Sequence, residues 1–171
     1  MDSCAQCGFD YDLGEATSAG PAVVVGIAQF GAILGGADPS HVRRRAQADV
    51  WSPLEYGCHI RDVLLVQRER VLTARRTDRP TFEPMGRDER VEHDGYALQD
   101  PDSVARQMAD AATMFANVLA RLPDSDWDRS VVYGYPARTE RSLRWVAVHT
   151  VHEVRHHLAD VARQLERHAD A

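Results

Sequence analysis

Four histidines and one glutamate stand close together near the C-terminus, in the stretch HTVHEVRHH at residues 149–157. Imidazole and carboxylate groups are common ligands of divalent metal ions, and helical residues four apart lie one turn above each other on the same face. Two pairs of ligands therefore fit a metal site: His152 with His156, or Glu153 with His157. The alternative interpretation is a solvated, histidine-rich outer face of a helix.

The stretch lies inside a single long amphipathic helix, which we predict over residues 142–168. Apolar residues recur along it at three- and four-residue spacing, which places them on one face that must be buried. These residues are Ala147, Val151, Val154, Leu158, Val161 and Leu165.

Helix geometry separates the two pairs of ligands, because each residue turns by about 100° around the axis. His157 and Glu153 lie roughly 80° and 120° from the centre of the apolar face, whereas His152 and His156 lie roughly 140° and 180° from it. We therefore expect His156 to face water. Glu153 and His157 should form a polar row along the helix, at the border of the buried face. The same row continues one turn away in each direction with His149 and Asp160.

A third ligand comes from an earlier helix. Ser52-Pro53-Leu54-Glu55 is typical of a helix start, with a capping box and a proline at the first position, and predicts a helix to about Arg75. In it, His59 lies one turn before Val63 and can point inward. A lone histidine there is more often a hydrogen-bonded core residue. Opposite Glu153 and His157, however, it would complete a two-histidine, one-carboxylate site with open coordination positions.

The remaining chain predicts two further helices and their connections. A first helix should begin near Pro21 and end at the glycine pair after Leu34. A third helix should begin at its cap, Asp102-Ser103, and end at Pro123. Residues 76–101 predict a long ordered loop, and VVYGYPARTE before Ser142 predicts a short hairpin or an extended loop. The fold class is therefore all-α: a four-helix bundle with a long crossover loop between helices two and three.

The N-terminus contains two cysteines at metal-ligand spacing, in Cys4-Ala-Gln-Cys7-Gly8. A glycine after the second cysteine is typical of the turns that hold zinc, but this is half of a four-ligand site. Cys58, a histidine or a second subunit would have to supply the rest. An inert thiol pair and a redox pair remain alternatives. We assign residues 1–19 to an N-terminal segment and residues 20–171 to the bundle domain.

Composition excludes several classes of function. With 20 basic and 26 acidic residues the net charge is −6, which gives no overall attraction to nucleic acid. All the basic residues are arginines, so lysine Schiff-base chemistry is excluded. The most apolar stretch, from Pro21 to Leu34, is short and interrupted by Gly26, Gln29 and Gly31, so we expect no membrane contact and a cytoplasmic protein.

Four stretches together resemble the DinB-like superfamily, over residues 20 to 168. They are WSPLEYGCHIRDVL, GRDERVEHDGY, LPDSDWDRS and SLRWVAVHTVHEVRHHLADV. The resemblance implies a four-helix bundle, commonly dimeric, with a divalent metal held by a histidine of the second helix and a pair four apart on the last. Its relatives include mycothiol-dependent maleylpyruvate isomerases and other thiol S-transferases.

The isomerase branch has a last-helix motif that Glu153, His157 and Asp160 match residue by residue. In much of the superfamily both last-helix ligands are histidines, which His152 and His156 would satisfy. The isomerases also have an additional C-terminal domain, so we expect a related reaction here instead of maleylpyruvate isomerisation itself.

The predicted site therefore consists of His59, Glu153 and His157 around one divalent ion, with zinc or nickel as the metal. We expect a homodimer that transfers a low-molecular-weight thiol such as mycothiol onto a small electrophile. The alternative is a non-catalytic metal-binding module of structural or stress-related role. Residues that could contact the substrate are Arg61, Asp62, Tyr133, Tyr135 and Arg138.

Overall fold

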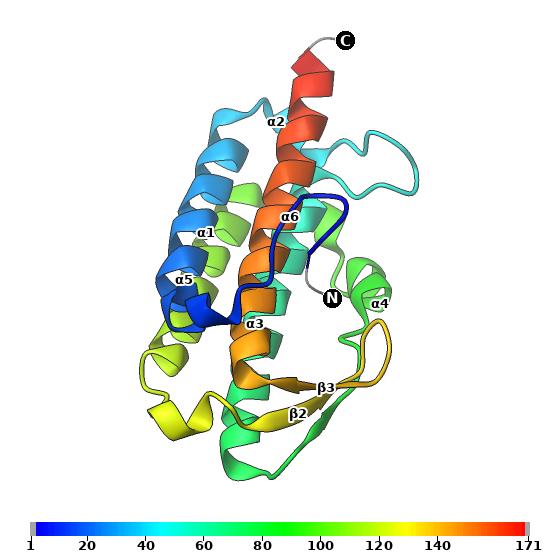
Figure 1. Cartoon of the computed structure of the whole chain (residues 1–171). Coiled ribbons are helices and arrows are strands. Elements are labelled where there is room, and N and C mark those ends of the chain that lie inside the picture. Colours follow the sequence, from blue (N-terminus) through cyan, green and yellow to red (C-terminus); the bar gives the residue numbers. More distant parts are fainter. Residues whose placement is uncertain (1–2, 170–171) are drawn as a thin grey trace.

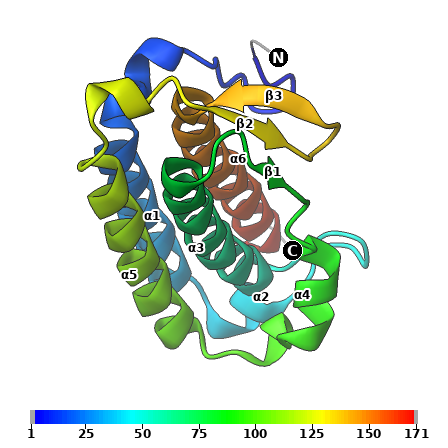
Figure 2. The same cartoon turned by 90° about the horizontal axis from the view of Figure 1, so that it is seen from below.

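A computed structural model describes residues 3–169 and contains a bundle of four long helices (Figure 1). The helices are α1 (Ala19–Gly36), α3 (Pro53–Arg76), α5 (Pro101–Leu119) and α6 (Leu143–Ala169). Helices α1 and α3 each pack against both α5 and α6 (Figure 2). The predicted all-α four-helix bundle is confirmed.

Side-chain caps fix where α3 and α5 begin. At the start of α3 the Ser52 hydroxyl accepts a hydrogen bond from the Glu55 N–H, and the Glu55 carboxylate accepts one from the Ser52 N–H, at 3.3 and 2.8 Å. This is the predicted capping box. The predicted start of α5 is wrong by about two residues, because Asp100 and not Asp102-Ser103 caps it: the Asp100 carboxylate accepts from the Ser103 N–H at 2.9 Å.

The predicted long ordered loop contains regular secondary structure that the sequence did not predict. The crossover between α3 and α5 contains a strand and two short helices, and the segment before α6 forms a hairpin and not an extended loop. The hairpin and the crossover strand make a three-stranded sheet, order β1-β2-β3, at one end of the bundle (Figures 1 and 2). The short elements are η1 (Leu13–Ser18), α2 (Pro39–Arg43), β1 (Thr81–Phe82), α4 (Arg87–His93), η2 (Tyr96–Leu98), η3 (Asp124–Asp126), β2 (Ser130–Tyr133) and β3 (Thr139–Ser142).

The N-terminal segment, residues 3–12, runs across α6 (Figure 1). The ring of Phe9 lies 5.3 Å from that of His152, and the ring of Tyr11 stacks 6.0 Å from that of Trp145. The segment therefore covers one side of α6 that the bundle helices leave open.

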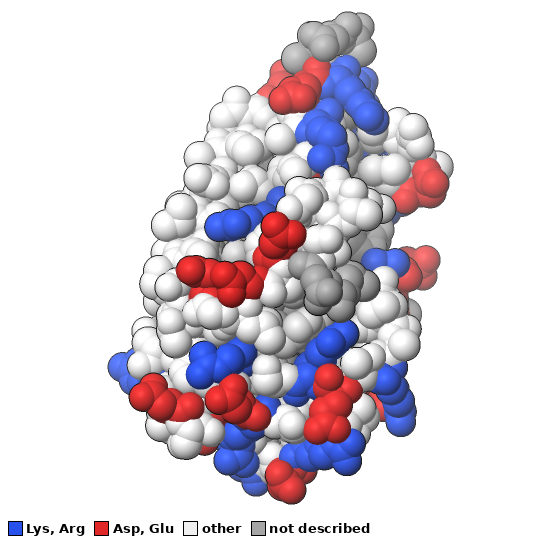
Figure 3. Space-filling model, in the orientation of Figure 1, with Lys and Arg blue, Asp and Glu red and all other residues white. Residues whose placement is uncertain are grey.

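The outer face of α1 is apolar and uncharged. The helical stretch Leu13–Gly36 is long and apolar enough to cross a membrane by length and composition alone, a property shared by core helices of soluble proteins. Val25 is 58% exposed, and charged residues are sparse on the part of the surface that α1 forms in Figure 3. The homodimer stays a prediction.

Helices α1 and α6 approach each other closely at Gly26. A Cβ atom added there would lie 2.7 Å from Cγ1 of Val154, a β-branched side chain whose χ1 angle is stiff. At Gly31, on the same helix, an added Cβ atom meets nothing within 4 Å. The absence of a side chain at Gly26 thus sets the α1–α6 distance.

Gly26→Ala should lower the free energy of unfolding by about 1–3 kcal/mol, because overpacking must push α1 and α6 apart. Gly31→Ala is the matched control and should be neutral or stabilising by up to about 1 kcal/mol, since alanine is the better helix former. Denaturant unfolding of both variants measures the difference. Equal stability of the two variants would contradict a close α1–α6 contact.

Candidate metal centre

The bundle brings the three predicted ligands together from two helices. His59 comes from α3, and Glu153 and His157 come from α6. One potential ligand atom from each lies within 4.8 Å of the other two. The rings of His59 and His157 are 5.2 Å apart, and His157 Nε2 lies 3.8 Å from Glu153 Oε2. Glu153 and His157 stand one turn apart on α6, facing the side of α3 that presents His59.

His59 is a neutral imidazole in a buried position. Its side chain is 4% exposed, and burial, with the neighbouring His157, lowers its pKa to about 3. Its Nδ1 atom is buried and has no hydrogen-bond partner among the described residues. A buried polar atom without a partner is costly, and a metal ion would satisfy a free imidazole lone pair. The simple core-histidine interpretation does not account for this atom.

Glu153 provides negative charge at the centre of the histidines. Burial alone would raise the pKa of its carboxyl, but the side chain of His152 and the imidazoles of His149 and His157 hold that pKa well below its ordinary value. The carboxylate is therefore ionised at neutral pH. His149 Nε2 and His152 Nδ1 each lie 3.6 Å from its Oε1 atom.

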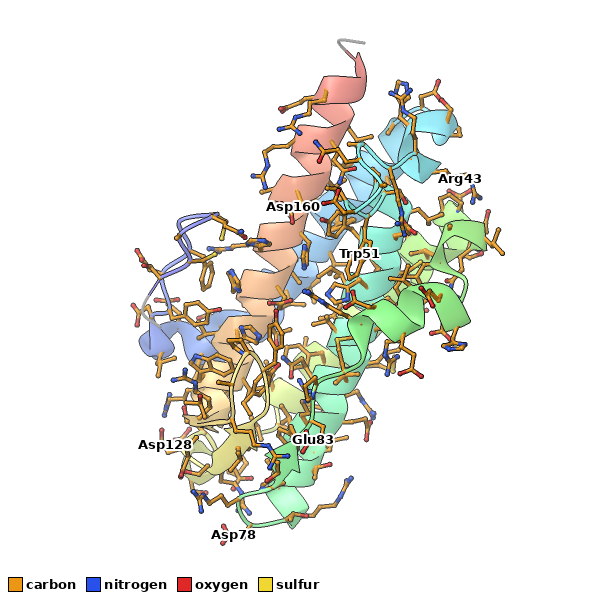
Figure 4. The ribbon with its side chains drawn as sticks, turned by 90° about the vertical axis from the view of Figure 1, so that its right-hand side faces the viewer. Arg43, Trp51, Asp78, Glu83, Asp128 and Asp160 are labelled. Atoms are coloured by element: carbon orange, nitrogen blue, oxygen red, sulfur yellow. The ribbon has the colours of Figure 1, made fainter. Side chains whose placement is uncertain are left out.

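Asp160 orients His157. The carboxylate Oδ2 of Asp160 lies 3.0 Å from His157 Nδ1, and Arg163 forms an ion pair with the same carboxylate. Because Nδ1 is held by Asp160, Nε2 is the nitrogen that faces Glu153. Metal-binding histidines are commonly fixed in this way by a carboxylate behind the ring. The ring of Trp51, which Figure 4 labels, packs 5.0 Å from that of His59.

The second pair of α6 histidines points to a different partner. His152 and His156 group with Cys4 and Cys7, all four ligand atoms lying within 4.8 Å of one another. The prediction that His156 faces water is wrong: its side chain is 16% exposed, and its Nδ1 lies 3.7 Å from Cys4 Sγ. The N-terminal segment covers this face of α6, which helix geometry alone could not reveal.

Most of the predicted substrate contacts have structural partners. Arg61 pairs with Asp62 at 2.8 Å, and the Tyr133 hydroxyl accepts hydrogen bonds from Gln67 and Arg70 at 3.0 and 2.7 Å. Arg138 forms an exposed ion pair with Glu83, and Tyr135 is half exposed. Of these residues, Asp62 also lines a cavity of about 400 Å³ between α3 and β1, together with Arg70 and Arg90. His59, Glu153 and His157 do not line this cavity.

Sequence reasoning missed Tyr11 and Trp51, both of which contact these histidines. The Tyr11 hydroxyl lies 3.0 Å from His149 Nδ1 and 2.9 Å from His152 Nδ1. No local pattern in the sequence signals the Tyr11 contacts, because they join residues 138 and 141 positions apart. The residues present fit a divalent ion held by two imidazoles and one carboxylate, a donor set that suits zinc, nickel and other first-row metals.

The sequence profile of the DinB superfamily matches residues 26–161. A comparison with curated proteins gave no match. Among solved structures, the chain is similar to YfiT from Bacillus subtilis, described as a probable metal-dependent hydrolase with an unusual four-helix bundle topology. The TM-score is 0.83 at 13% identity, covering 91% of this chain and 89% of YfiT.

A second similar structure is that of the mycothiol-dependent maleylpyruvate isomerase. The TM-score is 0.70 at 13% identity, and the match covers 88% of this chain and 60% of the isomerase. At such low identity both likenesses concern the fold. Both agree with the four-helix bundle of this chain.

If Asp160 orients His157 for a metal ion, Asp160→Ala should weaken metal binding at this site by roughly 10–100-fold, the usual cost of losing such a partner. Competition with a chromophoric chelator measures the affinity. Arg163→Ala is the matched control, because it removes the ion pair between Arg163 and Asp160 without touching His157, and it should leave affinity close to that of the unaltered protein. Unchanged affinity in Asp160→Ala would contradict the assigned role of Asp160.

Proposed function

Because this chain belongs to the DinB superfamily, we propose that His59, Glu153 and His157 bind one divalent metal ion and that the chain transfers a low-molecular-weight thiol onto a small electrophile. The observation that supports this most is the grouping of three ligand side chains from α3 and α6. Three protein ligands leave coordination positions open, as in catalytic sites, whereas structural sites are closed by four.

The protonation states of the three side chains suit this role. His59 is neutral and Glu153 is ionised, so neither needs to lose a proton before it can bind a metal ion at neutral pH. A divalent ion in this position would supply Lewis acidity, which favours the thiolate form of a bound thiol. The Glu153 side chain is 22% exposed, which leaves the group accessible from the surface.

The reacting thiol must come from a cosubstrate. Burial raises the pKa of Cys58 to about 12, so its thiol stays protonated and unreactive near neutral pH. Cys4 and Cys7 group with His152 and His156 and not with His59. Mycothiol or a similar small thiol would supply the nucleophile, and the electrophile would be a small molecule.

Metal-dependent hydrolysis is the second candidate, supported by the likeness to YfiT over 89% of its length. The same open positions would then serve water and not a thiol. The third candidate is a non-catalytic metal-binding module. All three share the metal site and differ in what reacts there.

Zinc- or nickel-loaded protein should accelerate the loss of free mycothiol in the presence of an electrophile panel, and His157→Ala should abolish this acceleration. His93→Ala, which alters an exposed histidine of α4, is the control and should retain it. Thiol titration and product mass spectrometry are the readouts.

Consumption of the electrophiles at the same rate without thiol would favour hydrolysis. No acceleration over metal-free protein in either arm would favour the non-catalytic module. Both results would contradict thiol transfer.

A further inference from the structure

We propose that Cys4, Cys7, His152 and His156 form a second metal site, a closed zinc site that fastens the N-terminal segment to α6. It uses none of the ligands assigned to the first site. Two thiolates and two imidazoles in a tetrahedral arrangement are typical of structural zinc, because four protein ligands leave no position for a substrate.

The distances suit one small ion. The four ligand atoms lie within 4.8 Å of one another, and Cys4 Sγ is 3.7 Å from His156 Nδ1. In a tetrahedral zinc site with the usual bond lengths, neighbouring ligand atoms are roughly 3.3–3.8 Å apart. The chain therefore needs only a small contraction to enclose an ion.

The backbone of the N-terminal segment holds the two cysteines in a tight turn. The Gly8 N–H donates to the Cys4 carbonyl and the Cys4 N–H donates to the Phe9 carbonyl, both at 2.8 Å. Gly8 has a φ of +70°, in the left-handed region that favours glycine. Ser3 and Asp10 pair across the turn in an isolated antiparallel bridge. Both cysteine side chains are thus brought beside α6 by a preformed loop.

Each histidine has one nitrogen close to a polar atom of a neighbour and a second nitrogen available to a metal ion. The Tyr11 hydroxyl lies 2.9 Å from His152 Nδ1, whereas His152 Nε2 is buried without a hydrogen-bond partner among the residues described. His156 Nε2 lies 3.6 Å from Asp160 Oδ2, and its Nδ1 faces Cys4. This is the pattern expected of metal-binding histidines, whose second nitrogen is anchored.

The other two groupings of ligand atoms on α6 have simpler explanations. One joins His149, His152 and Glu153, and the other joins His156, His157 and Asp160. Each comes from a single helix, and in the second the His157–Asp160 hydrogen bond of 3.0 Å accounts for the closeness. The cysteine set differs because it joins segments about 150 residues apart and leaves a buried imidazole nitrogen unpaired.

A zinc site here would stabilise a segment with few buried side chains. Residues 3–8 are exposed or only partly buried, so ordering them costs conformational entropy that apolar packing does not offset. The ion would also fix His152 beside Glu153, whose Oε1 atom lies 3.6 Å from His152 Nδ1. The zinc site would thereby hold His152 in place beside Glu153, a ligand of the first site.

Cobalt(II) substitution in the full-length reduced protein tests the proposal, because thiolate-bound cobalt gives a charge-transfer absorption that imidazole and carboxylate ligands do not. We expect this absorption in the unaltered protein and in His59→Ala, which alters only the first site. It should disappear in the Cys4→Ser, Cys7→Ser double variant. Cys58→Ala is the matched control and should retain it.

Zinc content is a second readout. It should fall by one ion per chain in the double variant, while the His59 site stays filled. His156→Ala should weaken zinc retention by the cysteines at least tenfold. Absence of thiolate absorption in the reduced unaltered protein would overturn the proposal, as would its persistence in the double variant. Zinc retention unchanged in His156→Ala would overturn the assigned ligand set. The cobalt result is independent of whether the first site is catalytic.

Discussion

The partial burial of an ionised carboxylate, Glu153, at the border of the bundle core is the constraint on which this structure depends. Glu153 lies next to Val154, a core residue that packs against Gly26 of α1. A charge in this position is stable only if nearby groups interact with it favourably. His149, His152 and His157 surround it on α6, and His59 approaches it from α3. These α6 histidines are therefore linked to one another through Glu153.

Helix periodicity divides the ligand residues of α6 between two sides of the helix. Successive residues differ by about 100° in direction, so Glu153 and His157 point one way and His152 and His156 another. The first pair faces α3 and the second faces the N-terminal segment. The two pairings in the HTVHEVRHH stretch are thus not competing choices. Each pair belongs to a separate group, and His152 and Glu153 bring the groups into contact.

Local sequence patterns predicted the features that depend only on residues close in sequence, such as helix caps and the direction of side chains on a helix. The capping box at Ser52 and Glu55 follows from residues three apart. The position of Glu153 and His157 beside the apolar face follows from helix geometry. The family resemblance agreed with that position, and the superfamily match now supports the fold.

Contacts between distant segments could not be predicted in the same way. His156 appeared solvent-facing because the helix alone leaves it opposite the apolar residues, yet the N-terminal turn covers it. The cysteine spacing did indicate half of a metal site and allowed a histidine as partner. It could not identify which histidine, since that depends on how residues 3–12 cross α6. Similarly, β1 forms only because the crossover runs beside β2.

The assignment of the α6 ligands to two separate metal sites is tested most directly by anomalous diffraction at the zinc absorption edge, on crystals of the zinc-loaded protein. Two peaks are expected for each chain. One should lie among His59, Glu153 and His157, and the other among Cys4, Cys7, His152 and His156. A single peak coordinated by His59 together with His152 and His156 would contradict this assignment.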